Sequence, residues 1–264
     1  MKPLLISVVR DEAMYRRCIV ENSNCDGCEF LKFDNRAKNE FITVLYNRAL
    51  DGLDDSMSRW LVFAHEDFEA REPLVAKLAE ADPGRIYGVI GGILRPQKRW
   101  LLGGIWPGVW LGQIEQSEKD GSNCVLMGTP VPMHTSVETV DCQFLAVHSS
   151  LVAQHHLRFD EHLSFDLYAE DFCMNASQNG VGGGVKTCIL PLACCHHSAG
   201  RIEPCFFEQL AYLNRKYPKS ECFCSVGYTI GGGRTIMRRW QKRFRGFLDL
   251  HLPFVVKWYF KVVG

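Results

Sequence analysis

The sequence predicts an α/β protein with a mostly parallel sheet and helices on both faces. Short apolar runs rich in β-branched residues recur through the first hundred residues, and segments with helical spacing separate them. This β-α-β-α-β-α-β order is typical of parallel sheets whose crossover helices cover both faces. The chain has 264 residues, 47% of them hydrophobic, which is enough to bury a large core.

Each predicted element of the first half follows from its local pattern. Apolar runs predict four strands, at residues 4–9, 28–33, 60–64 and 86–90. Helical spacing predicts the intervening helices at residues 12–22, 41–50 and 74–78. Gly91 and Gly92 are expected to close the fourth strand.

The second half is less regular. Residues 93–135 are rich in Gly, Pro and Trp, which predicts loops and short strands able to cover a bound ligand. Further on, strands are expected at 137–147 and 185–192, and helices at 172–179, stopped by Gly180, and 203–217. A glycine hinge at 231–233 divides the expected main domain, 1–230, from an appendage, 231–264.

Charge and hydropathy exclude several classes of protein. Thirty basic residues balance thirty acidic ones, which argues against a nucleic-acid partner. No apolar run reaches the roughly 20 residues that span a bilayer. The apolar stretch before Arg10 is too short for a signal peptide, so we expect a cytoplasmic protein.

The twelve cysteines are expected to be reduced core thiols, because the chain is long and has no secretion signal. An alternative is a structural zinc site made from two pairs, Cys25 with Cys28 and Cys222 with Cys224.

Polar side chains follow three predicted strands directly, as Arg10-Asp11, Asp34-Asn35 and His65-Glu66-Asp67. Ligands of parallel α/β sheets bind at the carboxyl ends of the strands, so these groups are expected to converge on one cleft. The chain has no glycine-rich phosphate loop. A bound diphosphate would therefore need a cation to neutralise its charge.

His65 and Asp67 are two residues apart, an offset that can aim both side chains at one cation. Imidazole nitrogen and carboxylate oxygen suit Mn²⁺ or Mg²⁺ in a mixed coordination shell, although a solvated turn explains the same pattern. Glu170 and Asp171 suit a helix N-terminus, and either can act as a general base. For His196 and His197 a buried, hydrogen-bonded histidine is the simpler interpretation.

Six motifs follow one another in a recognisable order between about residues 4 and 200. They are Asp34, Tyr46-Asn47-Arg48-Ala49-Leu50, the segment 61–67, the segment 140–146, the segment 159–171 and His197-Ser198-Ala199-Gly200. In this order they resemble the GT-A glycosyltransferases, most closely the family 2-like branch that includes streptomycin-biosynthesis type transferases. His65 stands where that family has the first Asp of Asp-x-Asp, and Cys142 where Gly is common.

The resemblance implies a GT-A, Rossmann-like fold and an inverting transferase of hexosyl type. The expected reaction moves a sugar from a nucleotide diphosphate donor, a UDP-sugar being favoured, to a hydroxyl of a glycan or lipid-linked acceptor. The implied donor-binding residues are Val9, Arg10, Asp34, Asn47, His65 and Asp67. The implied ligands of Mn²⁺ or Mg²⁺ are Asp67, His65 and His197. Asp171, or alternatively Glu170, would be the base, and Asp141 would bind the acceptor.

Two other classes of function stay open as alternatives. One is a catalytically inactive nucleotide-sugar or carbohydrate-binding protein of the same fold. The other is a nucleic-acid binder that uses the basic tail, which the neutral body disfavours.

The C-terminal appendage has the pattern of a basic amphipathic helix. Residues 234–245 include six basic residues and no acidic one, and Met237, Trp240, Phe244 and Leu248 recur at spacings of three and four. Residues 253–264 add further aromatic residues. We expect peripheral attachment to an anionic membrane, on the inner face of the cell membrane; the alternatives are packing against the main domain and a subunit interface.

Overall fold

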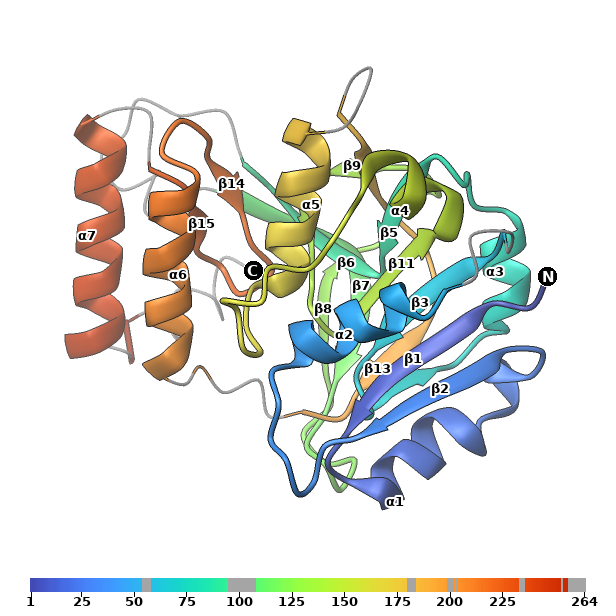
Figure 1. Cartoon of the computed structure of the whole chain (residues 1–264). Helices are drawn as coiled ribbons and strands as arrows, with labels where there is room; N and C mark the ends of the chain where they lie inside the picture. The colour runs from blue at the N-terminus through green and yellow to red at the C-terminus, as the bar shows by residue number, and fades with distance from the viewer. Residues whose placement is uncertain are drawn as a thin grey trace.

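The computed structural model describes residues 1–53, 58–94, 108–179, 184–198, 202, 204–232, 236–252 and 254–255. The fold is α/β, as the sequence predicts, and it is built on two large sheets (Figure 1). The main sheet has seven strands in the order β2-β1-β3-β11-β5-β12-β9. Its strands are β1 (Leu4–Val9), β2 (Glu29–Asp34), β3 (Trp60–Ala64), β5 (Arg85–Gly88), β9 (Ser136–Val137), β11 (Phe144–His148) and β12 (Lys186–Ile189).

The main sheet is mixed rather than mostly parallel. Strand β1 runs parallel to both β2 and β3, and β12 runs parallel to β5. Strand β11 is antiparallel to β3 and β5 on either side of it, and β9 is antiparallel to β12. The expected parallel arrangement therefore holds for the first three strands, and a strand from the middle of the chain interrupts it.

The second sheet has six strands, ordered β10-β6-β7-β13-β4 with β8 paired to β7. Two of them, β7 and β8, come from the stretch 93–135 that was expected to be loops and short strands, and residues 95–107 of that stretch lie outside the described part. The strands are β4 (Phe68–Ala70), β6 (Ile90–Leu94), β7 (Gly108–Gln116), β8 (Val125–Thr129), β10 (Thr139–Val140) and β13 (Cys194–His196). A short hairpin, β14 (Cys222–Phe223) with β15 (Thr229–Ile230), completes the strands.

The described helices follow the predicted segments with three differences, the first being α4 (Ser149–His155), which the sequence pattern did not predict. The helix expected at residues 12–22 is an α-helical turn that continues as a π-helix, η1 (Arg16–Val20), and a short 3₁₀ turn follows, η2 (Ser23–Cys25). Helix α5 begins four residues earlier than expected, and its predicted stop, Gly180, lies outside the described residues. The helices are α1 (Glu12–Tyr15), α2 (Ile42–Asp51), α3 (Leu74–Ala79), α4 (Ser149–His155), α5 (Tyr168–Asn179), α6 (Pro204–Lys216) and α7 (Ile236–His251).

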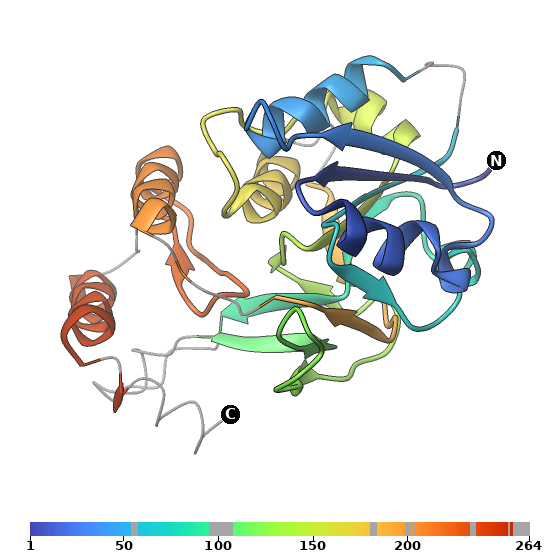
Figure 2. The same ribbon diagram turned by 90° about the horizontal axis from the view of Figure 1, so that it is seen from below.

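Both faces of the main sheet are covered, because its central strands are apolar on both sides. In β3, Leu61 and Phe63 pack with the core that contains α2, α4 and α5, while Val62 and Ala64 pack with the core that contains α1, α3 and the second sheet. Figure 2 shows α2 and α4 on one side of β1 and the second sheet on the other. The prediction of helices on both faces is confirmed.

Glycines 91 and 92 lie inside β6 and do not end a strand. A Cβ on Gly91 would lie 2.4 Å from the carbonyl oxygen of Thr139, and a Cβ on Gly92 would lie 2.4 Å from that of Phe223. These contacts are closer than any side chain tolerates. Glycine therefore lets β10 and the β14–β15 hairpin approach the backbone of β6 directly.

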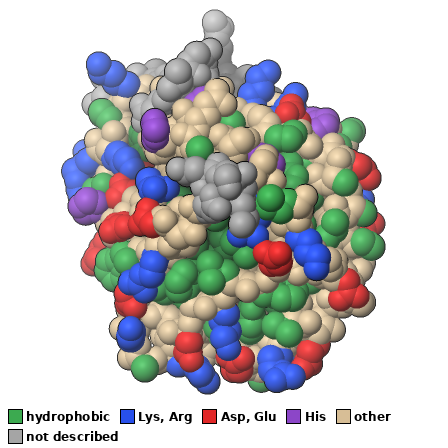
Figure 3. Space-filling model, turned by 45° about the vertical axis from the view of Figure 1, so that its right-hand side comes forward, with side chains coloured by type: hydrophobic (Ala, Val, Ile, Leu, Met, Phe, Trp, Pro, Cys, Tyr) green, Lys and Arg blue, Asp and Glu red, His purple; other side chains and the backbone are tan. Residues whose placement is uncertain are grey.

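Charged groups are interspersed over the surface in Figure 3, where Lys and Arg side chains alternate with Asp and Glu. Among the described residues, no helix is long and apolar enough to cross a membrane. Residues 256–264 of the predicted aromatic tail lie outside the described part.

Candidate functional site

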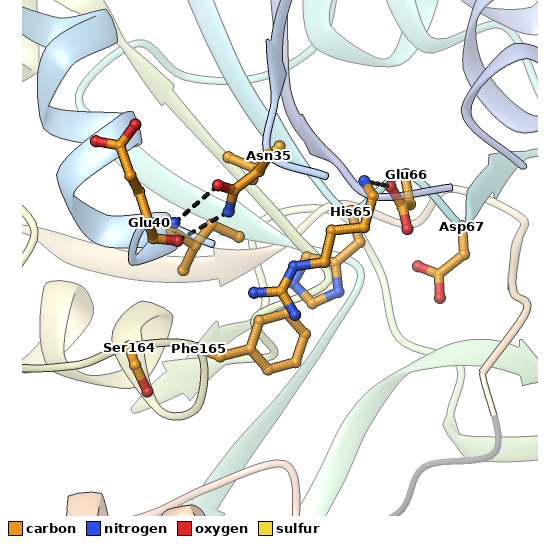
Figure 4. Close-up of a pocket in the computed structure, with 10 residues that line it drawn as sticks. Asn35, Glu40, His65, Glu66, Asp67, Ser164 and Phe165 are labelled. Carbon is orange, nitrogen blue, oxygen red and sulfur yellow. Dashed lines mark hydrogen bonds between the residues drawn. The ribbon is translucent and has the colours of Figure 1, made fainter. Parts of the chain in front are cut away.

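The ends of the first three strands open onto one cleft of about 460 Å³, solvent at its mouth included (Figure 4). Arg10 follows β1, Asn35 follows β2, and His65, Glu66 and Asp67 follow β3, so the predicted convergence of strand ends is present. The remaining wall comes from α2 and from the loop before α5, through Glu40, Ile42, Ser164 and Phe165, together with Val8 of β1.

Glu66 ties two of these strand ends together. Its carboxylate accepts hydrogen bonds from the backbone N–H groups of Arg10, at 2.5 Å, and Asp11, at 2.9 Å. Burial raises the pKa of Glu66 against the opposing effect of these two bonds. The guanidinium of Arg10 in turn bonds the side-chain oxygen of Asn39. A cationic group is thereby held at the cleft, and no sequence pattern predicts the bracing role of Glu66.

Asn35 is the polar residue of β2's end that faces the cleft. Its amide makes two 2.8 Å hydrogen bonds with the backbone of Glu40, which closes the loop between β2 and α2 (Figure 4). Asp34, the predicted donor-binding residue, is not among the residues that line the cleft. It is exposed and paired with Arg36, which lowers the pKa of its carboxyl group.

Two further predicted donor-binding residues are engaged in the fold. The side chain of Val9 is fully buried in the core, and its carbonyl accepts the N–H of Asn35. The amide of Asn47 is buried, and it donates to the carbonyl of Phe159 and accepts from its N–H, both at 2.9 Å. Asn47 therefore anchors the loop before α5 to α2. Neither Val9 nor Asn47 is among the residues that line the cleft.

The strongest cluster of potential metal ligands comprises His65, Asp67 and His196. One ligand atom from each lies within 4.8 Å of the others. His65 and Asp67 follow β3, and His196 ends β13 in the second sheet, so the two sheets meet here. Asp67 Oδ1 and His196 Nε2 are 3.3 Å apart, yet both are buried without a hydrogen-bond partner among the described residues.

The surroundings of His65 keep its imidazole neutral. Burial lowers its pKa to about 4, and nearby His196 adds to the effect. Its Nε2 lies 3.0 Å from the hydroxyl of Tyr168, which donates to the carbonyl of Cys142. That network assigns the proton to Nε2 and leaves Nδ1 with the lone pair that a cation requires. The ring also stacks on Phe165, with centroids 5.2 Å apart.

Asp67 and His196 favour each other's charged forms. Burial works to raise the pKa of Asp67, but the facing imidazole outweighs it, and the pKa is lowered. Burial likewise works to lower the pKa of His196, and contact with the carboxylate raises it instead. A carboxylate and two imidazoles this close together are a suitable donor set for a divalent cation, which would take the place of the proton between Asp67 and His196.

His197, the predicted third ligand, points elsewhere. Its Nε2 lies 2.7 Å from Glu69 Oε2, and its Nδ1 lies 3.0 Å from Ser117 Oγ and 3.9 Å from Cys195 Sγ. The ring thus stands between Glu69 and Cys195 rather than sharing a central point with them. This second cluster braces β4, β13 and β7, and His196 takes the place predicted for His197 in the first.

The two predicted base residues, Glu170 and Asp171, contact different parts of the structure. Glu170 is 1% exposed and accepts hydrogen bonds from Cys142 Sγ and Ser225 Oγ, each at 3.2 Å. Burial, reinforced by the charge of Asp141, raises its pKa to about 8. The same Asp141 acts electrostatically on His65 and His196, which places Asp141 and Glu170 on the side of the metal-ligand cluster.

Asp171 faces away from this group. Its carboxylate accepts from Lys216 Nζ at 2.7 Å and from the hydroxyl of Tyr217 at 2.7 Å. Lys216 also bonds Asp160 at 2.6 Å, so Asp171 anchors α6 to α5. Burial raises its pKa against the pull of Lys216. Of the two predicted bases, Glu170 is the one beside the site.

The cysteine pairs of the zinc alternative gain no further ligand among the described residues. All twelve cysteines are free thiols. Burial raises the pKa of Cys25 to about 12 and that of Cys28 to about 11, so both are protonated thiols when no cation is bound.

Comparison with known proteins adds little. No protein-family model matches the chain, and no curated protein sequence matches it either. The crystal structure of A197 from STIV aligns with 89% of this chain and 96% of its own, with 11% identity and a TM-score of 0.39. A likeness of this degree carries no argument about function.

Proposed function

We propose that the chain is a GT-A glycosyltransferase that moves a hexosyl group from a nucleotide diphosphate donor, a UDP-sugar in the first instance, to an acceptor hydroxyl with inversion. The observation that carries the proposal is the grouping of His65, Asp67 and His196 at the edge of the cleft, with Asp141 and Glu170 beside them. A transferase of this kind needs ligands for a cation on the diphosphate and, close to them, a carboxylate that acts on the acceptor hydroxyl.

The residues present fit a divalent cation, Mn²⁺ or Mg²⁺. Asp67 Oδ1 and His196 Nε2 are buried atoms that face each other at 3.3 Å, and the tautomer assigned to His65 leaves a lone pair on its Nδ1. His65, Asp67 and His196 would hold the ion, which as a Lewis acid would offset charge on the leaving diphosphate. Arg10 adds a second positive charge at the cleft.

The acceptor side is assigned to Asp141 and Glu170. Asp141, the more exposed of the two, would orient the acceptor hydroxyl by accepting its hydrogen bond. Glu170 would receive the proton in its ionised form, which is the minor form below pH 8 because its pKa is about 8 but is a stronger base than an ordinary carboxylate. Phe165, 49% exposed at the cleft, offers an apolar ring face to the donor.

Metal binding is the first test. Calorimetric titration with Mn²⁺ alone should show a site that Asp67→Asn and His196→Asn each weaken at least tenfold. The matched control is His162→Asn, because His162 is 75% exposed and outside the cluster. Equal Mn²⁺ affinity in all four proteins would remove the cluster from the proposal.

Turnover is the second test. The protein should release UDP from a UDP-hexose in the presence of an acceptor, and Glu170→Gln should reduce kcat by two orders of magnitude or more while UDP–Mn²⁺ binding persists. Failure of the protein to bind any nucleoside diphosphate with Mn²⁺ would refute the assignment.

A second candidate is a non-catalytic nucleotide-sugar-binding protein of the same fold. It is favoured by the burial of Glu170 and Asp171, each only 1% exposed. It predicts UDP-sugar binding without release of UDP under any acceptor condition. The turnover assay therefore separates the two candidates.

A further inference from the structure

Helix α7 displays a row of large apolar side chains to solvent. Trp240 is 43% exposed, Phe247 51%, Leu250 76% and, just beyond the helix, Phe254 67%. Trp240 and Phe247 are seven residues apart within α7, which puts them on one side of the helix. The rings of Trp240 and Phe244 stack with centroids 5.2 Å apart, so two aromatic side chains lie together at the N-terminal end of the row.

This row is not covered by the described part of the chain. Among the side chains of α7 whose burial is described, Leu248 is the buried one, at 7% exposed, and it lies about 100° around the helix from Phe247. On the opposite flank, a Cβ added to Gly246 would meet no atom within 4 Å. Figures 1 and 2 both show α7 at the margin of the molecule, beside α6.

The charge of the same helix selects the kind of partner. Its sequence has one acidic residue, Asp249, and five basic residues, Arg238, Arg239, Lys242, Arg243 and Arg245. Each basic residue near an anionic bilayer contributes about 1 kcal/mol of attraction. A second copy of the chain would instead bring two strongly basic helices together, which like-charge repulsion opposes.

We propose that α7 is an interfacial membrane anchor that lies in the plane of an anionic lipid surface. Trp240, Phe247, Leu250 and Phe254 enter the boundary between headgroups and acyl chains, and the basic residues of the helix bind lipid phosphates. This inference does not depend on the reaction proposed above.

The test is flotation of the full-length protein with vesicles. Vesicles that contain phosphatidylglycerol should carry the protein upward, and phosphatidylcholine vesicles should carry at least tenfold less. High salt should release it. The combined variant Trp240→Ser, Phe247→Ser, Leu250→Ser and Phe254→Ser should lose at least tenfold in partitioning.

The matched control is Val125→Ser with Leu126→Ser on β8, because these side chains are also exposed, at 57% and 64%. The control should float as the wild type does. Arg243→Glu, at an exposed position, should weaken binding to anionic vesicles alone. Circular dichroism melting of each variant establishes that it is folded.

Three results would overturn the proposal. The first is absence of flotation by the folded wild type with anionic vesicles. The second is equal flotation of the wild type and the four-residue variant. The third is a dimer, seen by light scattering, that the four-residue variant converts to a monomer while the wild type does not float, because the occupant of the row is then a second copy.

Discussion

Glu170 and Asp171 are consecutive residues in the first turn of α5, and their carboxyl groups meet opposite electrostatic surroundings. Consecutive helical residues point about 100° apart. Glu170 is thereby turned toward Asp141 and Asp171 toward Lys216. Leu167, just before the helix, has a φ of 60°, a left-handed conformation that costs a leucine about 1 kcal/mol. That strained residue sets where the turn begins.

Replacement of Asp171 by Asn should destabilise the fold. The change leaves the ammonium of Lys216 with Asp160 as its remaining carboxylate partner, so we expect a loss of roughly 2 kcal/mol, less than for a fully orphaned buried charge. Urea unfolding measures the loss. Asp51→Asn, which breaks an exposed ion pair with Arg158, is the control and should cost at most about 0.5 kcal/mol. Equal stability of the two variants would contradict the anchoring role.

Glu170 should make stability depend on pH. Its pKa is about 8 in the folded chain and near 4.5 when unfolded. Between these values the native state binds more protons than the unfolded state, so the free energy of unfolding falls as pH rises, by up to about 1.4 kcal/mol per pH unit. Above pH 8 the effect levels off. Glu170→Gln should reduce this dependence of the free energy of unfolding on pH. Urea unfolding across the pH range measures it, and the same pH dependence in wild type and variant would contradict the prediction.

Some of the site's residues could be predicted from sequence and others could not. Arg10, His65 and Asp67 were identifiable because each follows an apolar strand. The sequence could not decide whether His196 or His197 joins the cluster. Adjacent residues at a strand end point to opposite faces, and the pattern does not show which face meets Asp67. Only the pairing of β13 with β4, which sets His196 against Phe68, decides which imidazole approaches Asp67.

At the scale of elements, Gly92 lets two strands approach each other backbone to backbone, with no side chain between them. Gly92→Ala should cost roughly 1–3 kcal/mol, because the new methyl group would collide with the backbone of Phe223. Gly246→Ala is the opposite case. Its added methyl meets open space within a helix, so it should be neutral or stabilising by up to about 1 kcal/mol. Thermal unfolding of both variants is the measurement, and a harmless Gly92→Ala would mean that the β14–β15 hairpin is loosely placed.

The elements themselves were predictable where local pattern and burial agree. Strands β1 and β3 match their expected bounds because both of their faces are buried, which leaves continuous apolar runs. Strands β7 and β8 fall where short strands were expected without bounds, because their faces are partly exposed and Gly112 and Gly128 resemble turn signals. In the structure, a Cβ on Gly128 would strike the carbonyl oxygen of Gly112 on β7, and a Cβ on Gly112 would strike the carbonyl oxygen of Val89, just before β6.

At the scale of the whole molecule, stability should be distributed unevenly. The amides of β3 and β11 lie between two buried layers, whereas α7 has Leu248 as its one buried side chain among those described. Hydrogen exchange followed by mass spectrometry should therefore find β3 and β11 the slowest segments and α7 among the fastest. Protection of α7 equal to that of β3 would show that it is docked more tightly.

The mixed order of the main sheet has a consequence for synthesis of the chain on the ribosome. Strand β3 ends at Ala64, yet its second neighbour, β11, begins only at Phe144. At ordinary translation rates that partner follows on the order of ten seconds later. During the interval the nascent polypeptide presents an unpaired apolar edge to its surroundings, a natural target for chaperones and a point where aggregation competes with maturation.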